Sequence, residues 1–284
     1  MLNAMTVDVE DWYMTNGLDL APETWHRYED RIEANTARVL ALLERYGAKA
    51  TFFVLGCVAE RHPRLVEAIA RAGHQIGTHG YWHRLLTRMT HEDIVEDVLR
   101  SRALLEKLSG QRVDLFRAPS WSLGPPTYRV LLDLAREGFV CDSSVQPFRT
   151  PLSGVTGTPA RPFHPVIDGR RLELVEFPST VWNELGVGIP FAGGFYLRAM
   201  PYPLVRLLLR RVNRSAPGMV YVHPWEFDPE QPRLRASPLI RLAQYYRLEA
   251  TAPKLERLLR EFDFAPIGEV LKRLSVPDAP LPAS

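Results

Sequence analysis

The stretch ATFFVLGCVAERHPRLVEAIARAGHQIGTHGYWH, residues 50–83, decides the fold class of this 284-residue chain. It opens with β-branched and aromatic residues, which are typical of a buried strand. Pro63 then begins a segment with apolar residues at helical spacing, and this segment ends near Gly73. A second strand follows at 74–78. A strand, a helix and a strand in this order predict two parallel strands joined by a crossover helix.

The same alternation continues on both sides of this stretch. Further strands are predicted at 5–9, 113–116, 139–141 and 220–222, and helices at 33–46, 91–109, 126–137, 203–212 and 253–262. Regular alternation of strands and helices predicts a mostly parallel sheet with helices outside it. An α/β barrel and a doubly wound sheet both satisfy this pattern, and the periodicity does not choose between them.

The composition excludes several classes of protein. Hydrophobic residues make up 46% and charged residues 24% of the chain, which is typical of a globular protein and not of a disordered chain or a coiled coil. The formal charge of +2 gives no electrostatic footprint for nucleic acid. Cys57 and Cys141 both lie in apolar runs, so two buried thiols are favoured over a disulfide.

No membrane-spanning segment is predicted, because the uncharged apolar runs are too short. The N-terminal residues lack the basic region and the long apolar region of a signal peptide. These features lead us to expect a cytoplasmic location. The sequence does not predict an oligomeric state.

Acidic residues and histidines follow two of the predicted strands. Asp8, Glu10 and Asp11 lie at the end of the first strand, where Asp8 and Glu10 point to the same side. A helix cap or a surface acidic cluster would explain these acids equally well. His79 and His83 follow the strand at 74–78 and are four residues apart, which is a spacing that suits two metal ligands. Two histidines and one carboxylate would form an open, three-ligand metal site.

Three more polar residues follow strands in the same way. Arg117 follows the strand at 113–116, Asp142 the strand at 139–141, and His223 the strand at 220–222. Taken alone, they could be a surface arginine, a helix cap and a structural histidine. In α/β barrels and open α/β sheets, however, functional residues collect at the carboxyl ends of the strands. The shared position therefore predicts one site at that end of the sheet.

These motifs together resemble the NodB-homology polysaccharide deacetylases, carbohydrate esterase family 4, over about residues 3–272. The motifs are VDVED at 7–11, ATFFVLG at 50–56, HQIGTHGYWH at 74–83, FRAPSW at 116–121, CDSS at 141–144 and VYVHPWEFDP at 220–229. The last of them, with IPFAGGFYLRAMP at 189–201, is similar to the exosortase-associated branch found at exopolysaccharide loci.

The resemblance implies a fold and a domain organisation. The family fold is a distorted, incomplete (β/α) barrel, commonly of seven strands, which selects the barrel over the open sheet. We expect one domain over residues 1–274, with a branch-specific part at about 150–274. A loop-rich insertion is expected near 150–194, which is rich in proline and glycine. The Pro- and Ala-rich residues 275–284 are expected to be a flexible tail.

The resemblance also implies metal-dependent hydrolysis of an N-acetyl amide on a hexosamine of a bacterial surface polysaccharide or its precursor. His79 and His83 match the histidine ligands of one divalent metal ion, with zinc as the first candidate. Arg117 matches the arginine that orients the base, and His223 matches the general acid. Asp142 matches the aspartate that supports this acid. Through a polysaccharide assembly system, the chain could also associate with a membrane.

The first motif departs from the family pattern. The family usually has two adjacent aspartates, a base followed by a metal ligand, whereas this chain has Asp-Val-Glu-Asp at 8–11. Since residues two apart in a strand face the same side, we expect Asp8 to be the base and Glu10 the ligand. The alternative assignment makes Glu10 the base and Asp11 the ligand.

The third motif departs as well, because the usual aromatic residue is displaced and Ser120 precedes Trp121. A backbone N–H near these two residues would still complete an oxyanion hole. Trp121 and Trp225 are further candidates for contact with the faces of sugar rings, although each could be an ordinary core residue. Two other functions stay open: hydrolysis of another small amide or cyclic imide, and binding of carbohydrate without catalysis.

Overall fold

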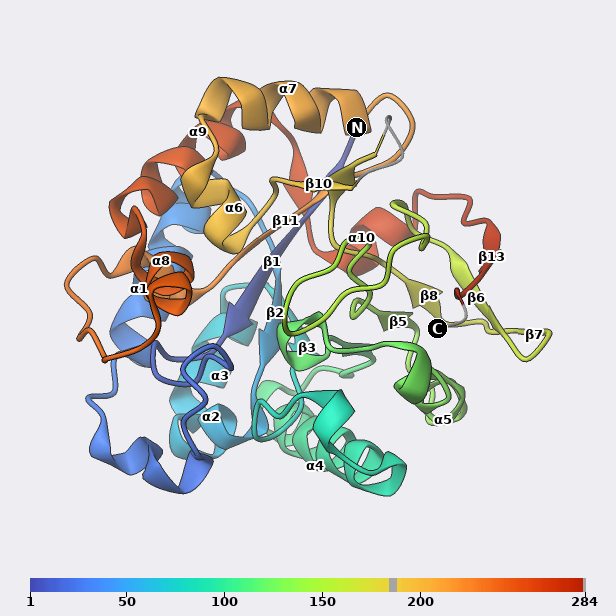
Figure 1. The fold of residues 1–284 in the computed structure, drawn as a ribbon, viewed down its shortest axis with the longest axis horizontal. Coiled ribbons are helices and arrows are strands. Elements are labelled where there is room, and N and C mark those ends of the chain that lie inside the picture. Colours follow the sequence, from blue (N-terminus) through green and yellow to red (C-terminus); the bar gives the residue numbers. More distant parts are fainter. Residues whose placement is uncertain (184–187, 283–284) are drawn as a thin grey trace.

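The computed structural model describes residues 1–183 and 188–282. At its centre, the described residues form a curled sheet of seven parallel strands in the order β11-β1-β2-β3-β4-β5-β8, and a short strand, β12, pairs with β1 (Figure 1). The strands are β1 (Asn3–Val9), β2 (Thr51–Val54), β3 (Gln75–Thr78), β4 (Leu115–Phe116), β5 (Cys141–Asp142), β8 (Val175–Glu176), β11 (Met219–Val222) and β12 (Phe264–Ala265). The predicted α/β barrel with seven strands is confirmed.

Helices cover the outside of this sheet (Figure 1). They are α1 (Ile32–Arg45), α2 (Gly56–Arg61), α3 (Pro63–Arg71), α4 (His91–Ser109), α5 (Val130–Arg136), α6 (Gly194–Ala199), α7 (Tyr202–Val212), α8 (Pro238–Tyr245), α9 (Thr251–Glu261) and α10 (Ile267–Leu271). Short 3₁₀ turns lie between them, including η1 (Pro22–Arg27), η2 (Leu86–Arg88), η3 (Pro119–Trp121), η4 (Pro125–Thr127), η5 (Pro224–Phe227) and η6 (Leu248–Ala250). All of the helices predicted from the sequence are present within a few residues.

The sequence did not predict α2. The strand expected at 50–56 ends at Val54, and Gly56 begins α2 instead. A Cβ on Gly56 would lie 2.3 Å from the ring of Tyr81, so only glycine permits this ring to pack against the turn. The apolar character of 55–59 therefore reflects a buried helix and not a longer strand.

The barrel is incomplete between β8 and β11, which are the two ends of the strand order in the described chain. The chain that follows β8 lies against β11 at this opening. The hydroxyl of Thr180 accepts a hydrogen bond from the backbone N–H of Met219 at 2.6 Å, and Gly193 forms a single parallel bridge with Tyr221. Residues of this irregular segment therefore provide hydrogen-bond partners for part of the edge of β11.

The loop-rich segment expected near 150–194 carries short strands in its described part. They are β6 (His164–Ile167), β7 (Arg170–Arg171), β9 (Val181–Trp182) and β10 (Ile189–Pro190). The C-terminal residues differ from the expected flexible tail, because β13 (Asp278–Pro280) pairs in parallel with β6. Here the tail supplies the outer strand of a small sheet, a position in which proline is tolerated. Residues 283–284 of the expected tail lie outside the described residues.

A buried arginine ties four strands together inside the barrel. Arg117 follows β4, and its side chain has no exposed surface. Its guanidinium donates to Thr6 Oγ1 at 3.0 Å and to Asp8 Oδ1 at 2.5 Å, both on β1. It also donates to the hydroxyl of Ser143 just after β5, at 3.1 Å, and contacts the sulfur of Met219 on β11. Since a buried charge requires a partner, the pair with Asp8 makes this position possible.

A second buried polar pair joins β5 to β8. Asp142 and Glu176 are register partners on these strands and have no exposed surface. Glu176 Oε1 accepts the N–H of Val145, and Asp142 Oδ1 accepts the hydroxyl of Ser144. Burial raises the pKa of Glu176 well above its usual range, and the charge and hydrogen bond of Asp142 raise it further. The pair therefore retains a proton, which the two carboxyl groups share.

Replacing Glu176 with glutamine should make folding less sensitive to pH. The folded state holds the proton of Glu176 at a pH where the unfolded chain releases it, so this group destabilises the wild type as the pH rises above about 4.5. Glutamine mimics the protonated form of Glu176, so the variant should not lose this stability as the pH rises. From urea unfolding at pH 5 and pH 8, we expect Glu176→Gln to gain about 1.4 kcal/mol or more relative to wild type at pH 8, the equivalent of one pKa unit. Equal pH slopes for the two proteins would contradict the shared proton.

Cys57 and Cys141 are free and buried, as the sequence predicts. Among the described helices, none is both long enough and apolar enough to cross a bilayer.

Candidate metal and catalytic site

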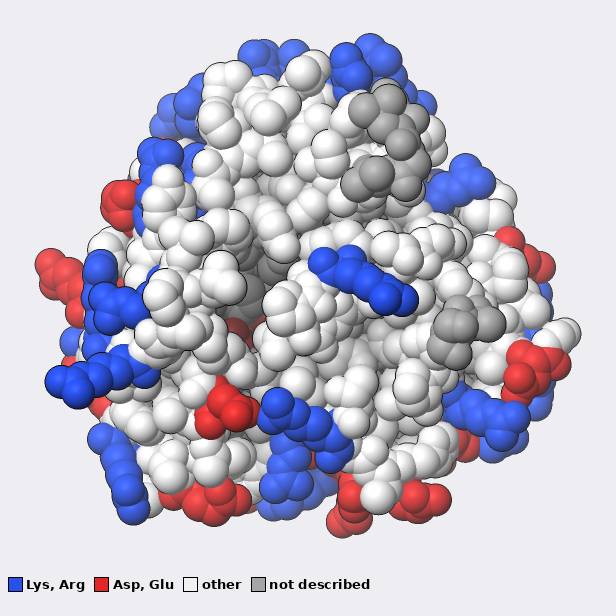
Figure 2. Space-filling model, viewed as in Figure 1, with Lys and Arg blue, Asp and Glu red and all other residues white. Residues whose placement is uncertain are grey.

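The candidate site lies at the carboxyl ends of the barrel strands. Asp8 is on β1, His79 follows β3, Arg117 follows β4 and His223 follows β11. The space-filling view is hollowed near its centre, over the end of β1, and acidic atoms are visible in the floor of this hollow (Figures 1 and 2). The structure thus brings together residues that are up to 215 positions apart in the sequence, as the strand-end pattern predicts.

Three side chains in this hollow converge as a metal site requires. One ligand atom from each of Glu10, His79 and His83 lies within 4.8 Å of the others, and all three side chains are buried. Glu10 Oε2 and His83 Nε2 are 2.6 Å apart. Two nitrogens and one carboxylate oxygen match the open ligand set of catalytic zinc sites.

Two of the three ligand candidates, His79 and Glu10, are oriented by a second contact. The Nδ1 of His79 lies 2.8 Å from the carbonyl oxygen of Arg117, which leaves its Nε2 free to coordinate. Burial lowers the pKa of His79 to about 4, so its ring is neutral, as a ligand must be. The indole of Trp225 donates to Glu10 Oε1 at 3.0 Å. The residues present therefore fit a divalent metal ion.

The charge state of Glu10 agrees with this fit. Burial alone would raise its pKa, but the neighbouring His83, His223 and His79 hold it well below the usual range. The Oε2 atom is buried and makes no hydrogen bond of good geometry within the described chain, and its close neighbour is His83. A buried, ionised carboxylate oxygen in these surroundings is a favourable ligand for a cation.

Asp11 points away from the three ligand candidates. Its Oδ1 accepts the backbone N–H of Trp12 at 2.8 Å, and its Oδ2 accepts the backbone N–H of Arg31 at 2.7 Å. It thereby fixes the loop between β1 and α1. This geometry favours Asp8 and Glu10, and not Glu10 and Asp11, as the two acids of the site.

Residues 83, 120 and 121 adopt backbone conformations that are rare outside glycine. The φ angles of His83, Ser120 and Trp121 are 54°, 52° and 57°. Such angles cost free energy and persist where the surroundings impose them, often at functional sites. The side chain of Asn16 joins these two turns, since its Nδ2 donates to Ser120 Oγ at 2.9 Å and lies 3.3 Å from His83 Nδ1. Nothing in the sequence pattern singled out Asn16.

His223 faces the acids from the neighbouring strand. Its Nε2 is 3.9 Å from Asp8 Oδ2 and 3.8 Å from Glu10 Oε1. Its Nδ1 is 3.0 Å from Glu226 Oε2. Burial acts to lower the pKa of His223, but the hydrogen bond to Glu226 and the nearby carboxylates raise it to about 9. The imidazole is therefore protonated at neutral pH.

The carboxylate that supports His223 is Glu226, and this corrects the expectation for Asp142. Asp142 accepts a hydrogen bond from the hydroxyl of Ser144 and is the register partner of Glu176, on the β5–β8 side of the barrel. Glu226 is three residues after His223 in the 3₁₀ turn η5, and it also accepts the backbone N–H of His223. Both bonds run from His223 to the same carboxylate oxygen of Glu226, so the three-residue spacing of histidine and glutamate around Pro-Trp was a usable signal.

A buried arginine completes this arrangement. Arg198 of α6 donates from Nε to Glu226 Oε1 at 2.8 Å, and both side chains are buried. Its remaining N–H groups donate to the carbonyl oxygens of residues 243, 244 and 246, at the end of α8. Burial acts to raise the pKa of Glu226, but the hydrogen bond to His223 and the charge of Arg198 lower this pKa below its usual value. No sequence pattern indicated Arg198, because only the fold brings it to Glu226.

The two tryptophans expected to contact sugar are largely covered by protein. Trp225 is 5% exposed and stacks on His223, with ring centroids 5.2 Å apart. Trp121 is 6% exposed, and the guanidinium of Arg117 lies 4.4 Å from its ring centroid. Both indoles therefore hold the polar groups of the site in place. Ser120 is partly exposed, and its hydroxyl is held by Asn16.

Two family models match separate parts of the chain. The model described as polysaccharide deacetylase matches residues 21–136, and a domain of unknown function, DUF3473, matches residues 143–272. The first region contains both histidines of the ligand group together with Arg117, and the second contains His223 and Glu226. Asp8 and Glu10 precede both matched ranges, so the site draws on three parts of the chain.

Curated relatives and solved structures agree with this match. The chain is 34% identical over 84 residues to a peptidoglycan-N-acetylglucosamine deacetylase of Bacillus cereus, covering 30% of each protein. It is 30% identical over 148 residues to a peptidoglycan deacetylase of Helicobacter pylori, covering 51% of this chain and 50% of the relative. The chain thus spans half or less of the length of these relatives. The crystal structure of a putative polysaccharide deacetylase from Mycobacterium smegmatis superposes with a TM-score of 0.61 at 21% identity, covering 100% of this chain and 94% of that one.

Proposed function

Because the chain carries a polysaccharide deacetylase domain of the NodB type, carbohydrate esterase family 4, we propose that it is a metal-dependent hydrolase that removes N-acetyl groups from hexosamine units of a bacterial surface polysaccharide or its precursor. One observation carries this proposal: Asp8 and His223 face each other beside the ligand group of Glu10, His79 and His83. A base, an acid and a metal site in one hollow are what hydrolysis of an unactivated amide requires.

Glu10, His79 and His83 would hold one divalent ion, and zinc is the first candidate for this ligand set. When bound, such an ion polarises a carbonyl oxygen and lowers the pKa of a coordinated water towards 7. The protein's own contribution is to keep both histidines oriented and the carboxylate ionised. The carbonyl of Arg117 orients His79, the amide of Asn16 lies 3.3 Å from Nδ1 of His83, and the indole of Trp225 holds Glu10.

Asp8 is the proposed base. Its Oδ1 is fixed by Arg117, so Oδ2 is the atom that turns towards His223 and the open hollow. This oxygen can accept a proton from the attacking water. Arg117 is itself enclosed by the rings of Phe53 and Trp121, 4.1 and 4.4 Å from its carbon centre, so its position is fixed before substrate arrives.

The backbone N–H of Ser120 is the proposed oxyanion donor. In this turn, the N–H of Trp121 is bonded to the carbonyl of Ala118, and that of Ser122 to the carbonyl of Pro119. The rare backbone conformation at Ser120 and Trp121 sets the direction of the turn. A donor fixed in this way needs no rearrangement as charge develops on the carbonyl oxygen.

His223 is the proposed acid. Glu226 holds its Nδ1–H, so the second N–H, on Nε2, points towards the acids and the open hollow. An amide nitrogen leaves poorly unless it is protonated. Donation from Nε2 to the sugar nitrogen would allow the amine to leave, and Arg198 keeps Glu226 ionised throughout.

The direct test is acetate release from N-acetylglucosamine oligomers by protein loaded with Zn²⁺. We expect acetate and free amine in equal amounts, and none after the metal has been removed with a chelator. A cyclic imide offered in the same assay tests the alternative activity. Acetate release no faster than in the metal-free control would overturn the proposed function.

His223→Ala should affect amide and ester substrates differently. We expect kcat on the N-acetyl amide to fall roughly 10²–10⁴-fold, as is typical for loss of a general acid. An activated acetate ester has a good leaving group and should lose far less activity. Glu226→Gln should show the same preference for the ester to a smaller degree, with metal content unchanged. An equal loss on both substrates would leave His223 as a binding or structural residue.

A further inference from the structure

Helix α8 exposes its leucines and buries a polar residue. Gln244 is buried, where it accepts a hydrogen bond from the hydroxyl of Thr15 at 3.0 Å and donates to the carbonyl oxygen of Trp12 at 3.0 Å. On the outer face, Leu239 is 77% exposed and Leu242 is 46% exposed. A helix that faces water carries the opposite pattern, with polar residues outside. The outer face of α8 therefore has the character of a contact surface.

The chain around this helix carries only positive charge. Between Glu230 and Glu249, the sequence contains four arginines and no acidic residue. Their side chains are exposed, and none of them forms an ion pair with an acid within residues 1–183 and 188–282. These arginines are Arg233, Arg235, Arg241 and Arg247. Exposed leucines among unpaired cationic groups are typical of a helix that lies on an anionic membrane surface.

A groove of about 510 Å³ is formed by α8 and the residues that flank it. Arg233, Arg241 and Arg247 line this groove together with Tyr246, and one acid, Glu249, also lines it. Guanidinium groups bind phosphate through paired hydrogen bonds, and tyrosine is common where a protein meets the head groups of a bilayer. The groove therefore suits the phosphate of a lipid head group.

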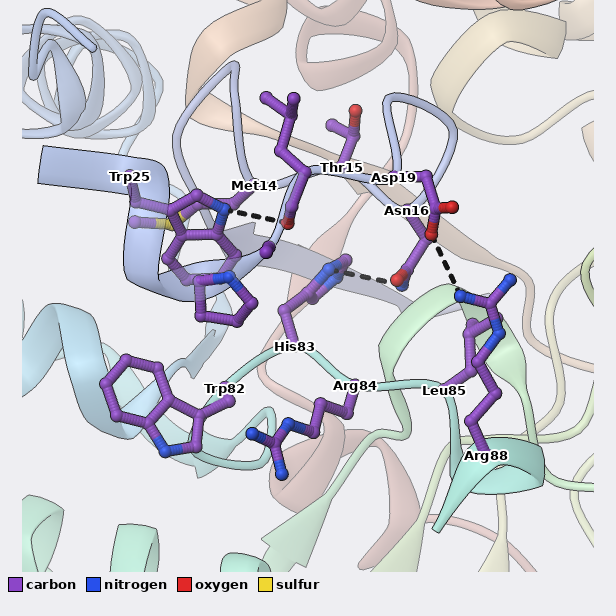
Figure 3. A pocket seen from close by; sticks show the side chains of 13 residues that line it. Met14, Thr15, Asn16, Asp19, Trp25, Trp82, His83, Arg84, Leu85 and Arg88 are labelled. Carbon is purple, nitrogen blue, oxygen red and sulfur yellow. Dashed lines mark hydrogen bonds and ion pairs between the residues drawn. The ribbon is translucent and has the colours of Figure 1, made fainter. Parts of the chain in front are cut away.

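Helix α8 lies beside the mouth of the barrel. Its residue Gln244 bonds to Thr15 in the loop after β1, and Figure 3 shows Thr15 and Asn16 of this loop close to His83. Arg198, which pairs with Glu226 in the site, also binds the carbonyl oxygens at the end of α8. On the face that carries the hollow, basic side chains gather on the side where α8 lies (Figures 1 and 2). A membrane that covers α8 would therefore lie next to the opening of the site.

We propose that α8 and the four arginines around it form a docking surface for an anionic lipid bilayer, with Leu239 and Leu242 inserted among the head groups. A bilayer offers many mobile anionic groups above an apolar interior, so it can accommodate the leucines and the arginines together. The core of a protein interface, by contrast, is depleted of charged residues. Lipid binding requires neither a metal ion nor the residues of the reaction centre, so this proposal does not depend on the deacetylase function.

Binding of the whole chain to vesicles tests this surface. We expect wild type to sediment with vesicles of equal parts phosphatidylglycerol and phosphatidylcholine, and to bind phosphatidylcholine alone at least about tenfold more weakly. Arg235→Gln/Arg241→Gln should weaken binding to the anionic vesicles about 25-fold, because each arginine near such a surface contributes about a factor of five. Leu239→Ser/Leu242→Ser should weaken it at least about tenfold, through loss of apolar insertion. All four side chains are exposed, so both variants should fold like wild type.

Two matched variants control for charge and for leucine. Arg129→Gln/Arg136→Gln removes the same charge at the two ends of α5, which lies on the other side of the sheet from α8 (Figure 1). Leu204→Ser/Leu207→Ser removes two exposed leucines of α7, at 41% and 46% exposure, where arginines also follow. Both control variants should bind the anionic vesicles like wild type.

Three results would overturn the proposal. The first is a wild-type protein that does not bind the anionic vesicles at all. The second is a loss of binding in either control variant equal to that in the α8 variants, since the contact would then not be specific to α8. The third is a wild-type dimer in sedimentation velocity that Leu239→Ser/Leu242→Ser dissociates, with no binding to vesicles, which would assign the leucines to a contact between two copies of the chain.

Discussion

Asp8→Asn is expected to lower kcat on an N-acetyl sugar by roughly 10²–10⁴-fold while the protein keeps one metal ion per chain. An asparagine amide cannot accept the proton of water, although its oxygen can still accept the hydrogen bond from Arg117. The change also removes the counter-charge of a buried guanidinium, and breaking such a pair costs about 3–5 kcal/mol. Steady-state kinetics, metal analysis and urea unfolding of the same preparation measure the three effects.

Asp11→Asn is the matched control for this experiment. Asp11 is also a buried aspartate of the first motif, but its oxygens accept backbone N–H groups of the loop and not Arg117. It should keep its metal and most of its kcat. The alternative assignment, with Glu10 as base and Asp11 as ligand, makes a different prediction, namely that Asp11→Asn loses the metal and Glu10→Gln retains it. That result would show that Glu10 is not the acidic ligand.

His79→Ala is expected to lose both the metal and all measurable deacetylation. The tautomer of His79 is fixed by the backbone carbonyl of Arg117, which leaves its Nε2 as the ring nitrogen that can coordinate. The variant would retain two protein ligands, whereas catalytic zinc sites have three. Metal per chain, measured by mass spectrometry after dialysis, should fall from one to near zero. Circular dichroism establishes that the variant is folded.

His91→Ala controls for the loss of a histidine as such, since His91 is on the surface at the start of α4 and pairs with Asp133. It should bind metal and release acetate like wild type. Stoichiometric metal in purified His79→Ala would place the metal site elsewhere in the molecule. It would not by itself contradict the roles of Asp8 and His223.

The sequence was most informative where function depends on strand ends. The ends of β1, β3, β4 and β11 were visible as β-branched or aromatic runs followed by polar residues, and the barrel brings those ends together. The grouping of Glu10, His79 and His83 could therefore be predicted from the sequence. Local periodicity also placed most helices, because each buries one apolar face against the sheet.

Contacts between segments that no periodicity connects could not be predicted. Asp142 was expected to support His223, but β5 directs it towards Glu176, while the turn after β11 supplies Glu226. Arg198 reaches Glu226 only because α6 packs beside that turn. Asn16 lies in a loop without regular structure. In each case tertiary packing decides which side chains come into contact, and no local sequence pattern reports that packing.

The pairing of β1 with β11 has a consequence for synthesis of the protein. The strand that carries Asp8 is made first, yet its partner, which leads into His223, follows more than 200 residues later. While the chain is still emerging from the ribosome, the three proposed metal ligands are complete long before the proposed proton donor has been made. We therefore expect a nascent chain stalled after β8 to bind metal without releasing acetate. Catalysis would begin only when the last strand of the barrel docks.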